Sequence, residues 1–173
     1  MKNIKRILLQ VALVTSIFAI SSFNFVEYSV KDQQFVDKAA RISLEEIKLG
    51  ELAQQKSAVS EVKELGKMME EGHRQSLDGL KALAERKSII LPSTPPQSAY
   101  EAYKNLKGKL EADFDKAYCE MMVSGHKGAI ELFEKASRDS NDIQIREWAA
   151  ATLPVLRVHL DHAVTCQMKC EKM

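Results

Sequence analysis

The sequence predicts an all-α protein, an antiparallel four-helix bundle with a short extra helix after a proline-rich loop. Four long segments repeat their apolar residues at intervals of three and four, as helices with one buried face do. The chain of 173 residues contains only seven Gly, four Pro and 6% aromatic residues, which argues against an all-β fold. Because 45% of its residues are apolar, it has enough nonpolar surface for one substantial core.

The first 22 residues differ from the rest of the chain and match the pattern of a secretory signal peptide. Three basic residues precede a mostly apolar run over residues 7–20, and small residues at 19 and 21 suit a cleavage site. We expect a short linker to follow over residues 23–31. The predicted location is therefore the bacterial periplasm or beyond it. The alternative is an uncleaved N-terminal anchor in the inner membrane, although the apolar run is short for a span.

The bundle domain is expected over residues 32–171 and begins with two long helices. Apolar residues recur at helical spacing over 32–56, where Asp32 suits the N-cap position, and again over 60–86. Only residues 57–59 separate these two runs. So short a connection predicts an antiparallel helical hairpin.

A loop and a short helix are expected between this hairpin and the second half of the bundle. Three prolines interrupt residues 87–97, which therefore cannot continue a helix. Ser98 and Glu101 have the spacing of a capping box, so a short helix is expected to start there and to loosen near Gly108.

Two further long helices complete the predicted bundle, one over about residues 110–137 and one that follows residues 138–142 and ends near Cys170. Pro154 lies inside the last helix, leaves the carbonyl of Ala150 without its usual partner, and is expected to kink the helix. The residues of this helix expected to face the core are Trp148, Ala151, Val155, Leu156 and Ala163.

Each of the four apolar stripes contains one polar residue at a position that faces the core. These residues are Glu46, His73, His126 and His159, one on each long helix. Because a buried carboxylate must be paired, protonated or bound to a metal, two interpretations are open. Either the four side chains bind a transition metal, or they form a hydrogen-bonded polar layer that fixes the register of the helices. Counted at 1.5 Å per residue from the connecting turn, His126 and His159 differ in height by about 7.5 Å, so their meeting requires the kink at Pro154.

The ligand set of three imidazoles and one carboxylate suits a Zn, Cu or Ni ion better than a di-iron centre. Di-iron bundles use mostly carboxylates, with a Glu-x-x-His pair on each of two helices. The sequence offers one such pair, Glu70 and His73, and Glu70 lies off the inward stripe. In the third long helix Val123 stands three residues before His126. We therefore expect a non-catalytic protein rather than a ferroxidase or an oxygen-activating enzyme.

A second and weaker candidate metal site lies at the end of the chain. The residues His159, His162, Cys166 and Cys170 follow one another at intervals of three, four and four, and so share one face of the last helix. Thiolates and imidazoles together bind Zn or Cu(I). The alternative, which the sequence favours, is that Cys166 and Cys170 form a local disulfide or stay unpaired, with Cys119 an inert buried thiol.

Five short segments carry a resemblance to a known family: Glu46–Ala53, Met69–His73, Phe114–Tyr118, Gly125–Lys127, and Leu153-Pro154 followed by His159-Leu160. In this order they resemble the domain-of-unknown-function 4142 family over about residues 31–165. Its members are often labelled predicted outer membrane proteins and are placed among ferritin-like bundles. The resemblance implies an exported ferritin-like four-helix domain, draws attention to the four inward polar residues, and implies no established activity. The family usually has an Asp directly before the histidine of the second helix, where this chain has Gly72.

The charge balance and the absence of several sequence motifs exclude some classes of function. Lys and Arg number 25 against 24 Asp and Glu, so nucleic acid is not an expected partner. The sequence has no Gly-rich phosphate loop, no Gly-x-Ser-x-Gly elbow and no Cys-x-x-Cys motif. Two hypotheses follow. One is an exported metal-binding protein for storage, buffering or stress protection, and the other is a structural or interaction module that contacts an envelope protein or the membrane surface. The sequence predicts no oligomeric state.

Overall fold

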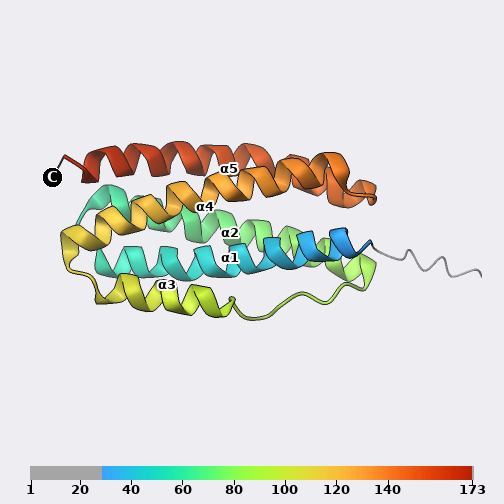
Figure 1. Cartoon of the computed structure of the whole chain (residues 1–173), viewed down its shortest axis with the longest axis horizontal. Helices are drawn as coiled ribbons and strands as arrows, with labels where there is room; N and C mark the ends of the chain where they lie inside the picture. The colour runs from blue at the N-terminus through green and yellow to red at the C-terminus, as the bar shows by residue number, and fades with distance from the viewer. Residues whose placement is uncertain (1–28, 173) are drawn as a thin grey trace, which may run out of the picture.

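The computed structural model describes residues 29–172, and over this range the chain is an all-α bundle of four long helices and one short helix (Figure 1). The predicted fold class is confirmed. The helices are α1 (Val30–Lys56), α2 (Ser60–Lys87), α3 (Gln97–Gly108), α4 (Glu111–Asp139) and α5 (Ile143–Cys170). The predicted signal peptide and most of the predicted linker lie outside the described residues. Within the described range, no helix combines the length and the apolar character that a membrane span needs.

The four long helices form two antiparallel hairpins that pack against each other. α1 lies beside α2 and α4 lies beside α5, while α2 also packs on α5 and α1 on α4. The loop over residues 88–96 and α3 carry the chain back along the bundle, so α4 starts at the end where α1 turns into α2 (Figure 1). α3 packs against α1 and α4 and buries Ala99 and Leu106.

Two helix starts differ from those that the sequence predicted. Ser29, not Asp32, is the N-cap of α1, because its hydroxyl accepts a hydrogen bond from the Asp32 amide at 3.1 Å. Asp32 is instead buried in the first turn, where the Ser140 hydroxyl donates to its carboxylate at 2.5 Å. This bond ties the start of α1 to the end of α4. α3 begins one residue earlier than predicted, with Pro96 as its N-cap, so Ser98 does not cap it.

The inward face of α5 also differs in part from the prediction. Ala151 and Val155 are exposed, Val155 to 45%, although both were expected to face the core. A step of four residues turns a helix by about 40° beyond a full circle, so the two steps from His159 back to Ala151 carry that residue about 80° away. α5 continues as a helix through the exposed Pro154. The residues of α5 that do face the core are Ile145, Ala149, Leu153, Leu156, His159, Ala163, Cys166 and Cys170.

The buried core consists of two apolar clusters with one polar layer between them. On α2, for example, the first cluster starts at Leu77 and the second ends at Met69, and His73 lies between them. α4 and α5 show the same division. The polar residues Glu46, His73, His126 and His159 are 6%, 3%, 1% and 4% exposed. All four therefore face inward, as their spacing indicated.

α1 and α2 approach each other closely where two glycines face one another. A Cβ added to Gly66 would lie 2.8 Å from the Gly50 carbonyl oxygen and 2.9 Å from the Ala53 Cβ, and a Cβ added to Gly50 would meet the Gly66 carbonyl oxygen. Side-chain carbons do not approach other atoms this closely. The missing side chains thus allow the two backbones to pack at this separation, next to the polar layer.

We expect Gly66→Ala to lower the free energy of unfolding by about 1–3 kcal/mol, the usual cost of overpacking, because the added methyl pushes α2 away from α1. Gly128→Ala on α4 is the matched control, since a Cβ there meets nothing within 4 Å. Alanine is a better helix former than glycine by about 1 kcal/mol, so the control should gain stability. Urea unfolding measures both, and a similar gain in the two variants would contradict the close packing of the glycine pair.

Candidate metal centre

Three histidines from three helices meet in the polar layer. His73 comes from α2, His126 from α4 and His159 from α5, and one ring nitrogen of each lies within 4.8 Å of the other two. His126 Nε2 is 3.5 Å from His73 Nε2 and 3.4 Å from His159 Nδ1. The structure therefore brings together three of the four residues predicted for the first site. We call His73, His126 and His159 the histidine trio.

A backbone hydrogen bond fixes which nitrogen of His126 faces the other two rings. His126 Nδ1 lies 2.8 Å from the carbonyl oxygen of Met122, one turn earlier in α4. Because a carbonyl oxygen can only accept, Nδ1 carries the proton and donates it. The lone pair on Nε2 of the neutral ring therefore points toward His73 and His159. There it can accept a hydrogen bond from one of them or bind a metal ion.

Burial keeps the histidine trio uncharged. Desolvation lowers the pKa of His73 well below its ordinary value of 6.5, and the nearby His126 and His159 lower it further. Desolvation also lowers the pKa of His126, against the opposing effect of its bond to Met122. The pKa of His159 falls to about 4 through desolvation and through the neighbouring His126 and His162. At neutral pH the rings are thus in the form that ligates metal ions.

Gly72 makes room for the His159 ring against α2. A Cβ at residue 72 would lie 2.5 Å from His159 Cε1 and 2.6 Å from its Nε2. The ring therefore fills the space that a side chain at this position would need. In this chain, the place directly before His73 serves to pack another histidine and does not supply a second carboxylate.

Glu46 is buried in the same layer but does not join the histidine trio. It is not among the ligand atoms that lie within 4.8 Å of one another. Its Oε1 lies 3.3 Å from where a Cβ on Gly125 would be, and its side chain lines a pocket of about 530 Å³ between α1, α3 and α4. Desolvation, together with the negative charge of Glu45, raises its pKa to about 8. Glu46 is therefore mostly protonated at neutral pH, and its Oε2 has no hydrogen-bond partner among the described residues.

The residues of the second predicted site are arranged differently from the prediction. His162 is exposed and belongs to neither group of converging ligand atoms. Cys119, which the sequence interpretation set apart as an inert thiol, instead joins Cys166 and Cys170 in a buried cluster. Cys119 Sγ lies 2.9 Å from Cys166 Sγ and 3.9 Å from Cys170 Sγ. All three cysteines are free, so the structure contains no local disulfide between Cys166 and Cys170. We call these three residues the thiol trio.

The sequence analysis did not predict that Cys119 lies beside Cys166, although the spacing of these residues from the histidines indicates it. In an antiparallel hairpin, residues at equal distances from a facing pair also face each other. Cys119 lies seven residues before His126, and Cys166 lies seven residues after His159. Both intervals equal two helical turns, or about 10.5 Å along the axis. Cys119 and Cys166 therefore face each other as His126 and His159 do, about two turns further along the hairpin.

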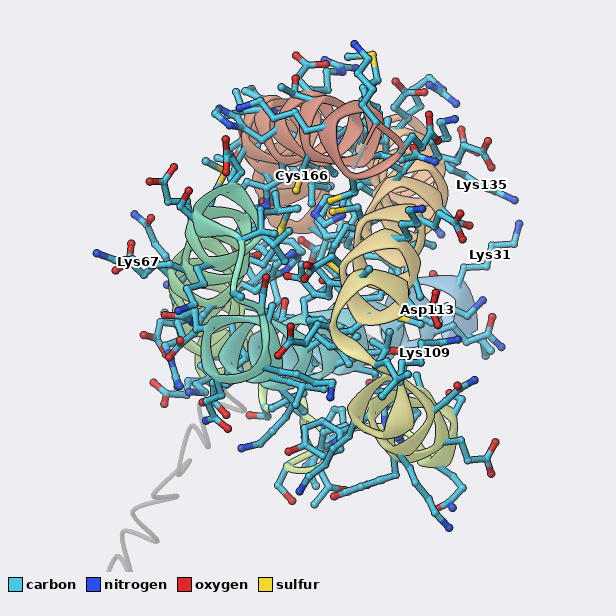
Figure 2. All side chains as sticks on the ribbon, turned by 90° about the vertical axis from the view of Figure 1, so that its left-hand side faces the viewer. Lys31, Lys67, Lys109, Asp113, Lys135 and Cys166 are labelled. Atoms are coloured by element: carbon cyan, nitrogen blue, oxygen red, sulfur yellow. The ribbon has the colours of Figure 1, made fainter. Side chains whose placement is uncertain are left out.

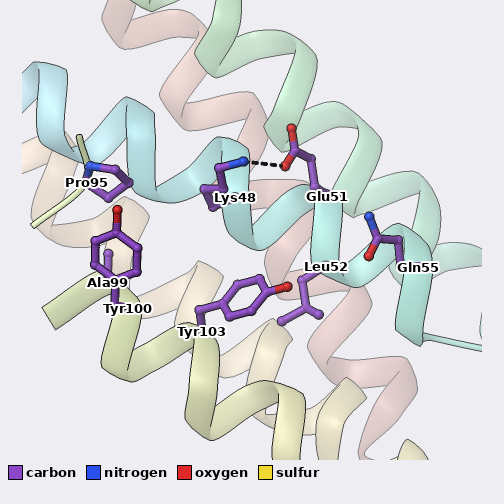
Figure 3. Close-up of a pocket in the computed structure, with 8 residues that line it drawn as sticks. All are labelled: Lys48, Glu51, Leu52, Gln55, Pro95, Ala99, Tyr100 and Tyr103. Carbon is purple, nitrogen blue, oxygen red and sulfur yellow. Dashed lines mark hydrogen bonds and ion pairs between the residues drawn. The ribbon is translucent and has the colours of Figure 1, made fainter. Parts of the chain in front are cut away.

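A further pocket lies between α1 and α3 and contains no residue of either trio. It has a volume of about 170 Å³, and Lys48 and Glu51 pair at 3.1 Å on its α1 side (Figure 3). Its lining is completed by Leu52, Gln55, Pro95, Ala99, Tyr100 and Tyr103. Because this set offers no imidazole or thiol, it is a poor candidate for a transition-metal site.

Comparisons with known proteins agree with this fold and supply a family. The crystal structure of a DUF305 fragment from Deinococcus radiodurans is similar, with a TM-score of 0.71 and 14% sequence identity, over 84% of this chain and 99% of that chain. At this identity the similarity concerns the fold alone. No curated protein matches the chain. The sequence profile of DUF4142, a domain of unknown function, matches residues 25–166. Since this match covers most of the chain, the protein belongs to the DUF4142 family.

Proposed function

We propose that the protein binds one transition-metal ion through the histidine trio and serves as an exported store or buffer of that metal. The observation that carries the proposal is the convergence of three buried ring nitrogens, with separations of 3.4 and 3.5 Å from His126 Nε2. A tetrahedral ion with metal–nitrogen bonds of about 2.0–2.1 Å spaces its nitrogen ligands about 3.4 Å apart. Two of the three nitrogen separations already match this spacing, and the third, between His73 and His159, is at most 4.8 Å.

The chemistry of the ligand set narrows the metal to Zn, Cu or Ni. Neutral imidazoles suit these ions, whereas oxygen-rich sites suit Mg, Ca and Mn. Glu46 lies outside the set, and protonation at neutral pH makes it a weak fourth ligand. The proposal of export rests on the basic and apolar pattern of residues 1–22.

The second candidate function is a structural module of the cell envelope, in which the same residues bind no metal. One observation favours it: His126 already donates to the Met122 carbonyl, and its Nε2 lies within hydrogen-bonding distance of both other rings. Hydrogen bonds among the three rings would fix helix register without a ligand, while Glu46 Oε2 stays without a partner in the described range. If the protein binds a metal, removing the metal lowers its free energy of unfolding. If it is a structural module, a chelator does not change its stability.

We expect untagged protein to bind about one equivalent of Zn²⁺, Cu²⁺ or Ni²⁺ and to lose about 2 kcal/mol or more of stability on chelation. His126→Ala should abolish both effects for Ni²⁺ and lower the bound Zn²⁺ or Cu²⁺ by one equivalent, because it removes the central nitrogen of the trio. His162→Ala on the exposed face of α5 is the matched control and should retain them. Metal analysis and thermal melts with and without chelator provide the measurements. A metal-free protein with the same melting temperature in chelator would instead favour the structural module.

Glu46 gives a pH dependence that separates its role from that of the histidines. Its pKa rises from 4.5 to about 8 in the folded chain, because burial favours the neutral acid. Between these values the unfolded chain has released the proton and the folded chain retains it, so Glu46 lowers stability as pH rises. The effect is about 4 kcal/mol between pH 5 and pH 8, at about 1.4 kcal/mol per pH unit.

Glu46→Gln should therefore remove this loss and leave the variant more stable than wild type at pH 8, with little difference at pH 5. The exposed Glu131→Gln is the control and should follow wild type at both values. Urea unfolding of metal-free protein at the two pH values measures the difference. An equal effect of Glu46→Gln at pH 5 and pH 8 would show that the carboxyl group does not titrate in this window.

A further inference from the structure

The thiol trio is a second cluster of converging ligand atoms, independent of the histidine trio. Its three Sγ atoms lie within 4.8 Å of one another, and Cys119, Cys166 and Cys170 are 0%, 3% and 1% exposed. Figure 2, which views the bundle from the end where α5 finishes, shows Cys166 inside the bundle beneath α5. Cys166 and Cys170 lie one turn apart on α5, and Cys119 faces them from α4.

Two unpartnered polar groups lie beside these thiols. Asp115 Oδ1 and the Tyr118 hydroxyl are buried and have no hydrogen-bond partner in the described range. The charge of Asp115 acts to raise the pKa of Cys166 and Cys170. Burial raises the pKa of Tyr118, and the charge of Glu46 adds to this ahead of Cys119 and Cys166. A buried polar atom without a partner costs about 1–3 kcal/mol, so such atoms are normally satisfied. The unpartnered carboxylate oxygen of Asp115, in an otherwise apolar cluster, favours a cation at this place.

We propose that the thiol trio binds one Cu(I) ion, with the three Sγ atoms as its ligands. Thiolates are soft ligands and select Cu(I) and Zn among the biological metals. Structural Zn sites almost always have four protein ligands, whereas no fourth His, Cys, Asp or Glu atom of the described residues converges with these three sulfurs. A three-coordinate soft ion is therefore the better match.

The sulfur positions are close to those that such an ion requires. Bonds of about 2.3 Å in a trigonal arrangement space the sulfurs about 4 Å apart. The distance from Cys119 Sγ to Cys170 Sγ is already 3.9 Å, and the distance from Cys119 Sγ to Cys166 Sγ must widen from 2.9 Å. Each thiol that becomes a ligand releases its proton to solvent, and no electron is transferred when Cu(I) binds.

The experiment measures Cu(I) binding in the full chain carrying His126→Ala, which removes the histidine trio as a competing site. The reduced protein is titrated without oxygen, using the acetonitrile complex of Cu(I) against a coloured Cu(I) chelator. We expect one equivalent to be retained, with ultraviolet charge-transfer absorption from thiolate to copper. Cys119→Ser and Cys170→Ser should each weaken binding by well over the roughly tenfold that loss of an outer-shell partner costs, since each removes a ligand. Met168→Leu, which alters an exposed thioether on the same helix, is the control and should bind as before.

Two further measurements show whether weaker Cu(I) binding in a variant comes from a lost ligand or from a folding defect. Copper X-ray absorption of the loaded protein should show a shell of sulfur only, and circular dichroism should show unchanged helix content in Cys170→Ser at the end of α5. A shell containing nitrogen or oxygen would overturn the proposal. So would Zn²⁺ that binds more tightly than Cu(I) and is released by Asp115→Asn, since Asp115 would then be a fourth ligand. The proposal would also be overturned if two of the three cysteines formed a disulfide in air that persisted when Cu(I) was added under reducing conditions, because these thiols would then not bind the ion.

Discussion

The burial of three imidazoles and a carboxyl group at one level of the bundle is the constraint on which the other features depend. An unpaired polar group in an apolar interior costs several kcal/mol, so the four side chains must be neutral, must contact one another, or must bind a ligand. The histidines are uncharged and in mutual contact, and Glu46 holds a proton. Sliding one helix by a turn, about 5.4 Å, would move a polar group into an apolar cluster. The layer therefore sets the register in which the helices can pack.

Two glycine–histidine pairs show how the helices accommodate this layer. Gly72 precedes His73 on α2 and leaves the space that the ring of His159 occupies. Gly125 precedes His126 on α4 and leaves room for the carboxyl group of Glu46, less tightly, since a Cβ there would lie 3.3 Å from Oε1. In each pair the histidine contributes a polar side chain to the layer. The glycine before it leaves space for a polar side chain from another helix. A side chain at position 72 would displace the His159 ring, whereas a Cβ at position 125 would require only a small shift of Glu46.

The sequence predicted the helices well because strong local signals mark them. Three prolines identify the loop before α3, and the break over residues 57–59 was placed without error. The four long helices have bounds within about two residues of those expected, since apolar periodicity over seven turns is hard to mistake. The same periodicity gave the inward direction of the four polar residues. Periodicity gives the angle of a residue around its own helix. That angle decides whether the residue is buried, so the burial of the four residues agrees with the prediction.

Periodicity does not report the height of one helix against another, and the errors in the candidate sites come from this. The estimate of about 7.5 Å for the height difference between His126 and His159 treated loop residues 140–142 as if each rose about 1.5 Å along a helix. Counted from the helix ends, they differ in height by three residues, about 4.5 Å, so they can meet without the expected kink at Pro154. Glu46 was assigned to the histidines by its angle and by a height that matched His73 within about 4.5 Å, although its side chain lines the pocket between α1, α3 and α4 instead.

The two trios divide unequally between the two hairpins. The α4–α5 hairpin supplies both other histidines and all three cysteines, whereas the α1–α2 hairpin supplies only His73. A motion that parts the hairpins would therefore dismantle the histidine trio by withdrawing one ligand and would leave the three sulfurs together. If the trios bind metal ions as proposed, opening of the bundle releases the ion of the first site, while occupancy of the second depends only on the integrity of its own hairpin.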